Sequence, residues 1–245
     1  YKRQLYIETP SNPMMEITDL SACAELAKEH NLLMITDNTF LSPYLQNPIA
    51  LGADIVIHSA SKFLCGHNDT IAGFVCSAKE ELAAKIRLIA KTTGGCLSPF
   101  DSWLVMRGIK TLAVRMERQQ ENAGNIARWL TEQKKVRKVY YAGLETHPGY
   151  EINAKQARGA GAMISFDVDS VETAQRVLEK VRVITFAESL GGTESLITYP
   201  MKQTHPDVPK EWREKLGITD TLLRLSVGLE HVDELIADLE QAFVS

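Results

Sequence analysis

A lysine in apolar surroundings is the first residue of this sequence that could do chemistry. Lys62 stands in the segment 57–63 (IHSASKF), among small and apolar residues where a solvated charge has little reason to be. Removal from water lowers the pKa of an amine, and a neutral lysine is a nucleophile suited to forming a Schiff base. The segment therefore predicts a reactive amine at Lys62.

Four polar residues follow predicted strands and could share a site with this lysine. Asn12 lies in the turn after the first predicted strand, Asp37 ends the second, and Ser59 and Ser61 follow the third. In open parallel sheets, ligands bind beyond the carboxyl ends of the strands, so these side chains would converge in one crevice. A Schiff-base lysine, a carboxylate for a protonated ring nitrogen and hydroxyls for a phosphate are the groups that pyridoxal 5'-phosphate requires.

Simpler roles stay open for these residues and for the nearby histidines. An aspartate at the end of a strand is commonly a turn former or a helix cap, and a serine there is commonly a cap. His58 and His67 are expected to be structural histidines. A Ser-His-Asp hydrolase is not expected, because the sequence holds no G-x-S-x-G segment.

The elements that would position these residues follow from apolar runs and helix signals. Strands are predicted at 4–8, 32–36, 54–57 and 71–76, and helices at 19–30 and 79–90. Thr18 or Asp19 can cap the first helix, and Asn31 can end it. Continuously apolar strands separated by helices predict a parallel sheet that is covered on both faces.

A long helical pattern at 101–133 leads from this sheet to a second predicted unit. Further strands are predicted at 136–141, 162–168, 183–187, 196–199 and 222–227, with helices at 171–180 and 232–243. The composition places a domain boundary near Ile109, between a domain of residues 1–109 and a smaller α/β domain of residues 110–245. We therefore predict a two-part α/β fold.

Composition and charge exclude several classes of protein. The 245 residues are 44% hydrophobic and 24% charged, which excludes a disordered chain. The net charge of −4 is spread evenly, so we expect neither a nucleic-acid partner nor a membrane partner. No apolar run approaches the roughly 20 residues of a membrane span. The four cysteines lie far apart without a C-x-x-C pair, which favours a reducing, cytoplasmic compartment and no metal site.

Several segments, in order along the chain, carry a resemblance to a known family. They are residues 8–13 (ETPSNP), 36–39 (TDNT), 59–63 (SASKF), 66–67 (GH), 188–192 (ESLGG) and 223–228 (LRLSVG). The chain resembles the Cys/Met-metabolism group of pyridoxal-phosphate enzymes, which are the trans-sulfuration enzymes. This resemblance implies an aminotransferase-like, fold type I architecture, in which residues 1–109 would be the C-terminal part of an incomplete large cofactor-binding domain.

The same resemblance implies roles for the residues of the predicted crevice. Lys62 would hold pyridoxal 5'-phosphate covalently and shuttle the protons of the reaction, and Asp37 would pair with the pyridine nitrogen. Ser59 and Ser61 would donate to the phosphate. Asn12 would lie near the ring oxygen of the cofactor and the carboxylate of the substrate.

Two residues from the C-terminal half are implied at the substrate end of the site. Arg224 would bind the α-carboxylate of an amino-acid substrate, and Ser189 would support that end of the pocket. A planar guanidinium can donate two parallel hydrogen bonds to a carboxylate. Arg224 stands in an apolar run, where an unpaired arginine is costly, so the alternative is a structural salt bridge.

The choice of relative depends on one acidic residue. Glu188 resembles the acid of γ-acting family members, where it would favour a cationic distal amino group, and a surface acid is the alternative. We therefore expect cystathionine γ-synthase-like activity, the γ-replacement on an O-acylhomoserine with cysteine. Cystathionine β-lyase is the first alternative, followed by cystathionine γ-lyase or homoserine sulfhydrylase, and a non-catalytic remnant of the fold is the alternative from another class.

The resemblance also implies an assembly and a longer chain. Family members form homotetramers built from tight dimers, with active sites at the dimer interface. Relatives carry a substantial segment before the strand at 4–8, and it would supply a ring-stacking aromatic residue and further phosphate contacts. We expect residues 1–245 alone to bind the cofactor poorly and to turn over little.

Overall fold

A four-stranded sheet is the framework of the N-terminal half, in a computed structural model that describes residues 3–203 and 207–244. Its strands, in spatial order, are β1 (Gln4–Glu8), β2 (Leu33–Asp37), β3 (Ile55–Ser59) and β4 (Gly73–Cys76). The first three are parallel, as their apolar runs predicted. Asp37 and Ser59 therefore lie at the same edge of the sheet, beyond which the sequence placed a crevice.

The last strand of this sheet departs from the prediction. β4 runs antiparallel to β3, because the segment 60–72 leaves and rejoins the same end of β3 and Ser59 pairs with Gly73. All four residues of β4 are exposed, and Ile71, which the prediction placed in the strand, is 90% exposed. Tyr6 of β1 is 53% exposed as well. Part of this sheet is therefore exposed in the described part of the chain.

Helix α1 (Leu20–Glu29) packs against the first sheet, with which it forms a small apolar core. Asp19 caps this helix, since its side chain accepts a hydrogen bond from the N–H of Ala22 at 3.0 Å. Asn31 follows the helix with a φ of 52°, in the left-handed region where helices commonly end. Both positions were predicted from the sequence.

The helix predicted at 101–133 is two helices. α4 (Pro99–Ile109) and α5 (Leu112–Thr131) are separated by a short turn. Gly108, next to this turn, packs so closely on the segment after β3 that a Cβ atom would come within 2.2 Å of the carbonyl oxygen of Cys65. The change of direction thus occurs where the two segments touch.

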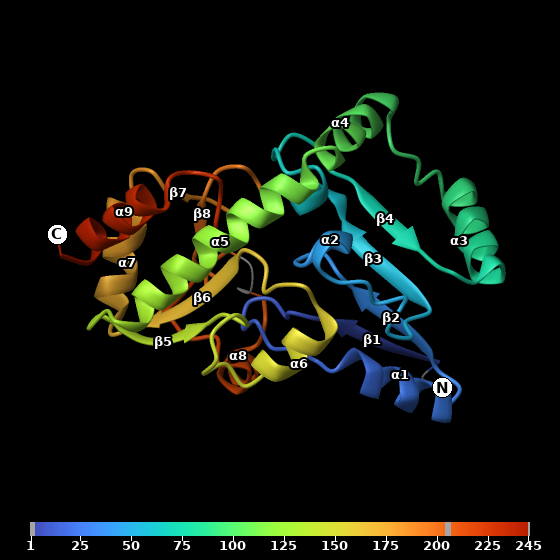
Figure 1. The fold of residues 1–245 in the computed structure, drawn as a ribbon, viewed down its shortest axis with the longest axis horizontal. Helices are drawn as coiled ribbons and strands as arrows, with labels where there is room; N and C mark the ends of the chain where they lie inside the picture. The colour runs from blue at the N-terminus through green and yellow to red at the C-terminus, as the bar shows by residue number, and fades with distance from the viewer. Residues whose placement is uncertain (1–2, 204–206, 245) are drawn as a thin grey trace.

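A five-stranded sheet is the framework of the C-terminal half, in the order β5-β6-β9-β8-β7. Its strands are β5 (Val136–Tyr140), β6 (Met163–Val168), β7 (Thr185–Phe186), β8 (Leu196–Thr198) and β9 (Leu222–Ser226). Neighbouring strands are antiparallel except for β7 and β8. The helices α5, α7 (Val171–Lys180) and α9 (Val232–Val244) pack with this sheet in the main apolar core (Figure 1).

The remaining helices are shorter or more exposed. They are α2 (Ser42–Leu45), α3 (Glu80–Thr93), α6 (Tyr150–Gln156) and α8 (Lys210–Leu216). The sequence predicted α3 only, because the other three are too short to show a helical period. Within residues 3–203 and 207–244, every helix is too short or too polar to cross a membrane.

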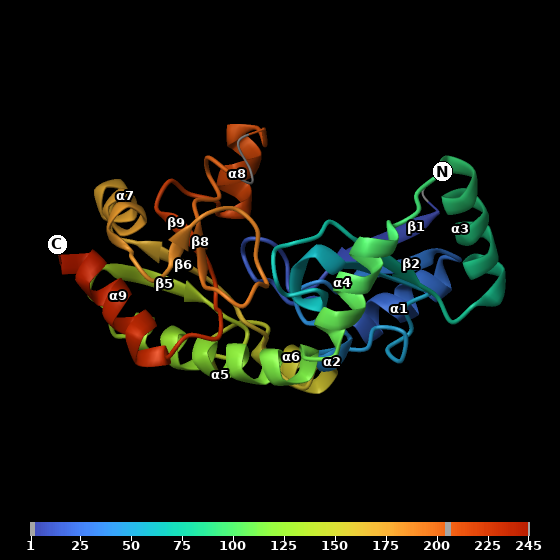
Figure 2. The ribbon, with the colours of Figure 1, turned by 90° about the horizontal axis from the view of Figure 1, so that it is seen from above.

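Helix α5 connects the two halves (Figure 2). It contacts the segment after β3 as well as β5, β6 and α9 of the second half. The predicted domain boundary at Ile109 coincides with the end of α4. That division stays a prediction. The four cysteines are free, and no group of three or more potential metal ligands occurs in the described ranges.

Candidate functional site

Lys62 lies in a π-helical segment, Ala60–Leu64, that follows the carboxyl end of β3. Its own φ and ψ of −97° and −132° are not helical, and irregular turns of this kind often occur at functional sites. The Nζ atom donates a hydrogen bond to Oγ of Ser189 at 2.9 Å. Burial lowers the pKa of the amine, the charge of Arg224 lowers it further, and Glu188 opposes both. The sequence predicted this direction from the apolar neighbours of the lysine.

Ser189 comes from the loop between β7 and β8, 127 residues away along the chain. Its φ is 80°, a left-handed conformation that is uncommon for serine and that persists where the surroundings enforce it. Gly191 packs closely against the π-helical segment, since a Cβ atom at this position would come within 2.6 Å of the backbone nitrogen of Phe63. The loop and the π-helical segment are therefore in direct backbone contact.

Arg224 extends from β9 into the same region and is 2% exposed. Its Nη1 donates to Oδ1 of Asn12 at 2.8 Å, and its Nη2 donates to the carbonyl of Ser189 and to Oγ1 of Thr198, both at 3.1 Å. Its Nε has no partner among the described residues. Burial lowers the pKa of the guanidinium to about 10.

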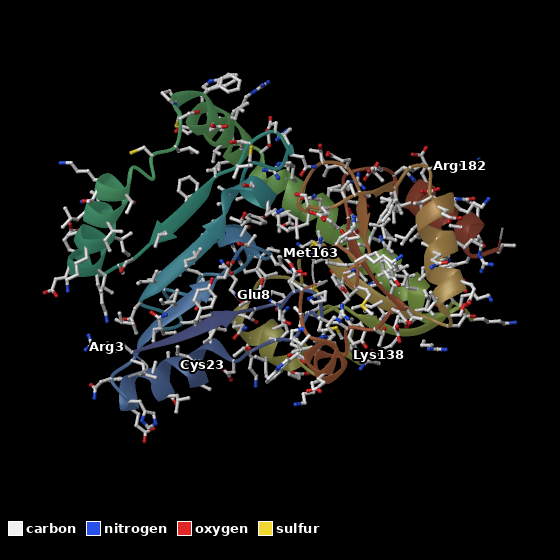
Figure 3. All side chains as sticks on the ribbon, turned by 180° about the vertical axis from the view of Figure 1, so that it is seen from behind. Arg3, Glu8, Cys23, Lys138, Met163 and Arg182 are labelled. Carbon is white, nitrogen blue, oxygen red and sulfur yellow. The ribbon has the colours of Figure 1, made fainter. Side chains whose placement is uncertain are left out.

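A structural salt bridge is not what holds Arg224. Within residues 3–203 and 207–244 no carboxylate lies within ion-pair distance of the guanidinium, and its three partners are uncharged. Asn12 is bound in turn by Glu8, whose Oε2 accepts from the backbone N–H of Asn12 at 3.4 Å. Burial raises the pKa of Glu8, which lies at the end of β1 near the middle of the molecule (Figure 3).

Asp37 has one engaged carboxylate oxygen and one that is nearly free. Oδ1 accepts from the backbone N–H of Thr39 at 3.0 Å and from its hydroxyl at 2.6 Å. Among the described residues, Oδ2 accepts a hydrogen bond only from the hydroxyl of Tyr6, at 3.5 Å. The hydroxyl of Thr39 also accepts from the backbone N–H of Ser59 at 2.8 Å, so Thr39 connects two predicted site residues.

The two predicted serines differ in their surroundings. Ser61 is bound on both sides by Ala72: its hydroxyl donates to the carbonyl at 3.3 Å and accepts from the N–H at 2.9 Å. The half-buried hydroxyl of Ser59 has no hydrogen bond within the described part of the chain. Ser59 is thus the more available donor for a ligand, and Ser61 would have to rotate.

Sequence reasoning missed the residues that support the site. Thr39 and Thr198 hold Asp37 and Arg224, and Glu8 holds Asn12. Only Thr39 left a local signal, because a residue two positions after an aspartate commonly closes a turn with it.

The two histidines have separate surroundings. His58 is 6% exposed, burial lowers its pKa, and its Nδ1 has no partner in the described ranges. Nδ1 of His67 lies 2.7 Å from the carbonyl oxygen of Cys65. Neither ring contacts Lys62 through a hydrogen bond among the described residues. Their structural role stays the better interpretation.

Glu188 is exposed and lies in the same loop as Ser189. Its carboxylate acts electrostatically on both Lys62 and Arg224, in each case favouring the charged form. It therefore lies within electrostatic range of both cations, although it makes no hydrogen bond within the described part of the chain.

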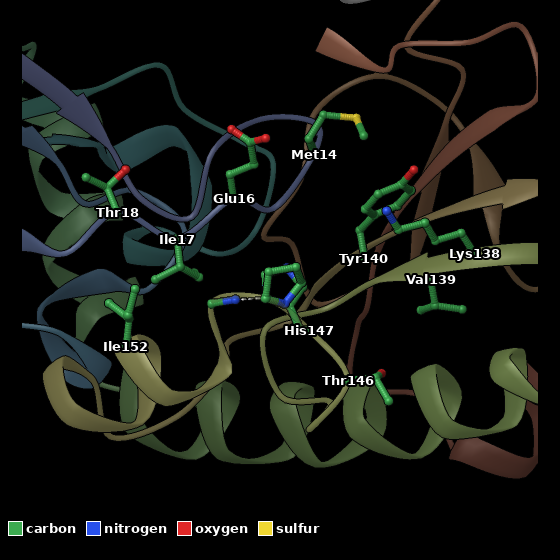
Figure 4. Close-up of a pocket in the computed structure, with 12 residues that line it drawn as sticks. Met14, Glu16, Ile17, Thr18, Lys138, Val139, Tyr140, Thr146, His147 and Ile152 are labelled. Atoms are coloured by element: carbon green, nitrogen blue, oxygen red, sulfur yellow. Dashed lines mark hydrogen bonds between the residues drawn. The ribbon is translucent and has the colours of Figure 1, made fainter.

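A separate cavity of about 350 Å³ lies between the segment 14–18, β5 and α6 (Figure 4). Met14, Tyr140 and His147 are among its lining residues, and His147 is held by the N–H of Gly149 at 3.0 Å. None of the predicted site residues lines it. The candidate site is therefore the region around Lys62 and Arg224 and not this cavity.

Comparison with known proteins identifies the family of this chain. The profile of the Cys/Met metabolism PLP-dependent enzymes matches residues 2–244. The chain belongs to this family. Its curated relatives include a cystathionine β-lyase of Lactococcus lactis subsp. cremoris (strain MG1363), which is 50% identical over 98% of this chain. A cystathionine γ-lyase of Bacillus subtilis (strain 168) is 49% identical over 98%, and a cystathionine γ-synthase of Haemophilus influenzae is 48% identical over 99%.

Solved structures of family members have the same fold. The cystathionine γ-lyase of Lactobacillus plantarum, in complex with L-serine, matches 99% of this chain and 64% of its own with a TM-score of 0.97 at 47% identity. A cystathionine γ-synthase of Xanthomonas oryzae pv. oryzae matches with the same TM-score at 43% identity, over 98% of this chain and 62% of its own. The chain spans 63% of the length of the first two curated relatives named above. The predicted fold class and family are confirmed.

The groups at the site fit the cofactor that defines the family. Lys62 offers a half-buried amine whose pKa is lowered, which favours the neutral nucleophile. Oδ2 of Asp37 is open to a ring N–H, and the hydroxyl of Ser59 is open to a phosphate oxygen. Hydrogen bonds link four of the predicted residues, namely Lys62, Ser189, Arg224 and Asn12. Two others, Asp37 and Ser59, are linked to each other through Thr39.

Proposed function

We propose that the whole protein is a pyridoxal-phosphate-dependent trans-sulfuration enzyme that acts on sulfur-containing amino acids. The observation that supports this most strongly is the hydrogen bond from Lys62 to Ser189, beside the buried guanidinium of Arg224. It brings a nucleophilic amine and a carboxylate-binding group from the two halves of the chain to one place.

In this proposal each residue at the cofactor end has a defined task. Lys62 binds the cofactor covalently and, once released, moves protons at the α and β carbons of the substrate. Asp37 accepts the ring N–H through Oδ2, and Ser59 donates to the phosphate, with Ser61 joining after rotation of its hydroxyl. When bound, the cofactor supplies an electron sink for negative charge at the α carbon.

Arg224 would bind the α-carboxylate of the amino acid. Of the five N–H groups of the guanidinium, three donate hydrogen bonds to Asn12, Ser189 and Thr198. The N–H of Nε and one N–H of Nη1 remain for a ligand. The orphaned Nε fits this role, since a buried donor without a partner is costly and a carboxylate oxygen would satisfy it. Asn12 and Thr198 orient the guanidinium.

Within the family, we propose γ-replacement on an O-acylhomoserine with cysteine, as in cystathionine γ-synthases. Glu188 supports this choice, because its exposed carboxylate acts on the space between Lys62 and Arg224, where it would favour a distal ammonium group. Cystathionine β-lyase activity is the second candidate. It is favoured by the Lactococcus relative of that name, at 50% identity.

The products of the reaction distinguish these activities. The purified whole protein is incubated with O-acylhomoserine and cysteine, or with L-cystathionine alone. Formation of cystathionine supports the γ-synthase, pyruvate supports the β-lyase, and 2-oxobutyrate supports a γ-lyase. The variant Glu188→Ala is expected to lose γ-replacement selectively. Unchanged γ-replacement in that variant would remove the argument for this choice.

The covalent linkage to the cofactor tests whether the protein is an enzyme of this family at all. We expect the whole protein to be yellow and to lose that absorbance with borohydride, which reduces a Schiff base. Lys62→Ala should show no such linkage. A protein that stays colourless after the cofactor is added would instead support a non-catalytic member of the fold.

A further inference from the structure

One face of α5 carries buried polar side chains that donate to backbone carbonyl groups of the candidate site. Arg115 and Gln119 are 3% and 0% exposed, and they stand one helical turn apart. Within residues 3–203 and 207–244, no carboxylate lies within ion-pair distance of Arg115. A buried guanidinium without a counter-ion is costly unless its donors are used, so its partners indicate its task.

Arg115 binds the backbone directly after Lys62. Its Nη1 donates to the carbonyl of Phe63 at 2.8 Å, and its Nη2 donates to that of Leu64 at 3.3 Å. Gly66 leaves room for the guanidinium, because a Cβ atom there would come within 2.1 Å of Nη1. The guanidinium, whose Nη2 also donates to the carbonyl of Gly108 at 2.9 Å, thus holds the end of the π-helical segment against the end of α4.

Gln119 binds the two segments from the other half of the chain. Its Nε2 donates to the carbonyl of Gly192 at 2.6 Å and to that of Val227 at 3.1 Å. Gly192 lies in the same loop as Ser189, between β7 and β8, and Val227 directly follows β9, the strand of Arg224. One helix, which runs along both halves in Figure 2, therefore binds the backbone on both sides of the contact at Lys62.

We propose that Arg115 and Gln119 are positioning residues for Lys62. They hold, from one rigid helix, the two backbone segments that place Nζ of Lys62 2.9 Å from the hydroxyl of Ser189. Release of either segment would lengthen this bond, admit water to the amine and move it away from Arg224. The inference rests on the function proposed above, since Lys62 is taken as the residue that holds the cofactor.

The test uses the cofactor-loaded whole protein and follows the pH at which its absorbance changes. Arg115→Lys keeps the charge and loses the planar fork. Water at the lysine nitrogen and distance from Arg224 both favour the protonated form. We therefore expect the midpoint of the absorbance change with pH to rise by about half a pH unit or more, and kcat to fall about tenfold. Gln119→Met, which removes both donors, should shift the midpoint in the same direction.

Two variants of the same helix separate positioning from stability. Ile126→Val loses core packing at a fully buried site that contacts neither segment through a hydrogen bond, and Arg118→Lys makes the same chemical change at an exposed site. Both should keep the midpoint of the wild type. Free guanidinium ion should partly restore the midpoint in Arg115→Ala, and it should not affect Ile126→Val.

An Arg115→Lys protein with the midpoint of Ile126→Val would overturn the proposal. If Arg115→Lys does not fold, Thr111→Val takes its place, because it removes the acceptor of Nε at 3.1 Å and otherwise only the hydrogen bond from the Thr111 hydroxyl to the carbonyl of Gly108 among the side-chain contacts of the described residues. A smaller upward shift is then expected, and no shift counts against the proposal. A wild-type protein without cofactor absorbance would remove the proposed function and this inference together, whereas a normal wild type with unshifted variants would remove this inference alone.

Discussion

Replacing Arg224 with lysine tests the substrate-binding end of the site. The guanidinium is 2% exposed, and donates three hydrogen bonds of 2.8 to 3.1 Å to Asn12, Ser189 and Thr198. These contacts fix its plane and leave Nε free for a carboxylate. Lysine keeps the positive charge but offers a point charge on a flexible stem instead of a planar fork. The substitution therefore removes the geometry and keeps the electrostatic attraction.

The expected effect follows from one lost hydrogen bond to a charged acceptor. Such a bond contributes about 1.5–3 kcal/mol, and about 1.4 kcal/mol corresponds to a tenfold change. We expect the KM for the amino-acid substrate to rise about ten- to a hundredfold. The change in kcat should be smaller, because the α-carboxylate is bound alike in the ground state and in the transition state.

Steady-state kinetics of the cofactor-loaded whole protein measure this effect. Arg182→Lys is the matched control, since Arg182 is exposed and its recorded hydrogen bonds to Asp238 come from its backbone. Circular dichroism and cofactor absorbance establish that both variants are folded and loaded. A KM for Arg224→Lys within twofold of the wild type would refute the assignment of Arg224 as the carboxylate-binding residue.

Three further predictions concern thiols, a helix cap and pH. Exposed Cys76 and Cys96 should react with iodoacetamide at pH 8 at least about tenfold faster than Cys65. Cys65 is 1% exposed, and burial raises the pKa of its thiol to about 11. Peptide mass spectrometry measures the three rates, and equal rates would contradict the prediction. Asp19→Ala should lower the free energy of unfolding by about 1 kcal/mol in urea, and Asp19→Asn should not. Burial and Arg224 lower the pKa of Lys62. The rate of its covalent reaction with added cofactor in the stripped whole protein should therefore rise with pH and reach its plateau at a pH below that at which a free lysine loses its proton. A rate that still increases at the pH at which a free lysine loses its proton would contradict this prediction.

The sequence alone pointed to the residues that we propose to carry the chemistry. Asp37 and Ser59 end apolar strands and Lys62 follows Ser59 closely, and a continuously apolar strand is visible in a short run of residues. Caps are equally local, so Asp19 and Asn31 were found at the ends of α1. The family followed from short segments such as 59–63, in which the resemblance could be seen.

Local patterns failed where a contact between distant segments decided the outcome. The helix predicted at 101–133 breaks beside Gly108, where the chain packs closely on the carbonyl of Cys65. β4 is antiparallel because the segment that carries Lys62 folds back to the end of β3. The local sequence around Gly108 does not indicate the contact with Cys65, and the local sequence of β4 does not indicate the path of the segment that precedes it.

The arrangement of the site itself depends on the tertiary structure. The sequence named Lys62, Ser189 and Arg224 but could not bring them within hydrogen-bond distance, because they lie in three segments far apart along the chain. Their supports, among them Arg115 and Gln119, look like ordinary helix residues until the fold shows what they bind. A hydrogen bond requires both partners to be in place, and for a buried donor the partner is decided by packing and not by the neighbours in sequence.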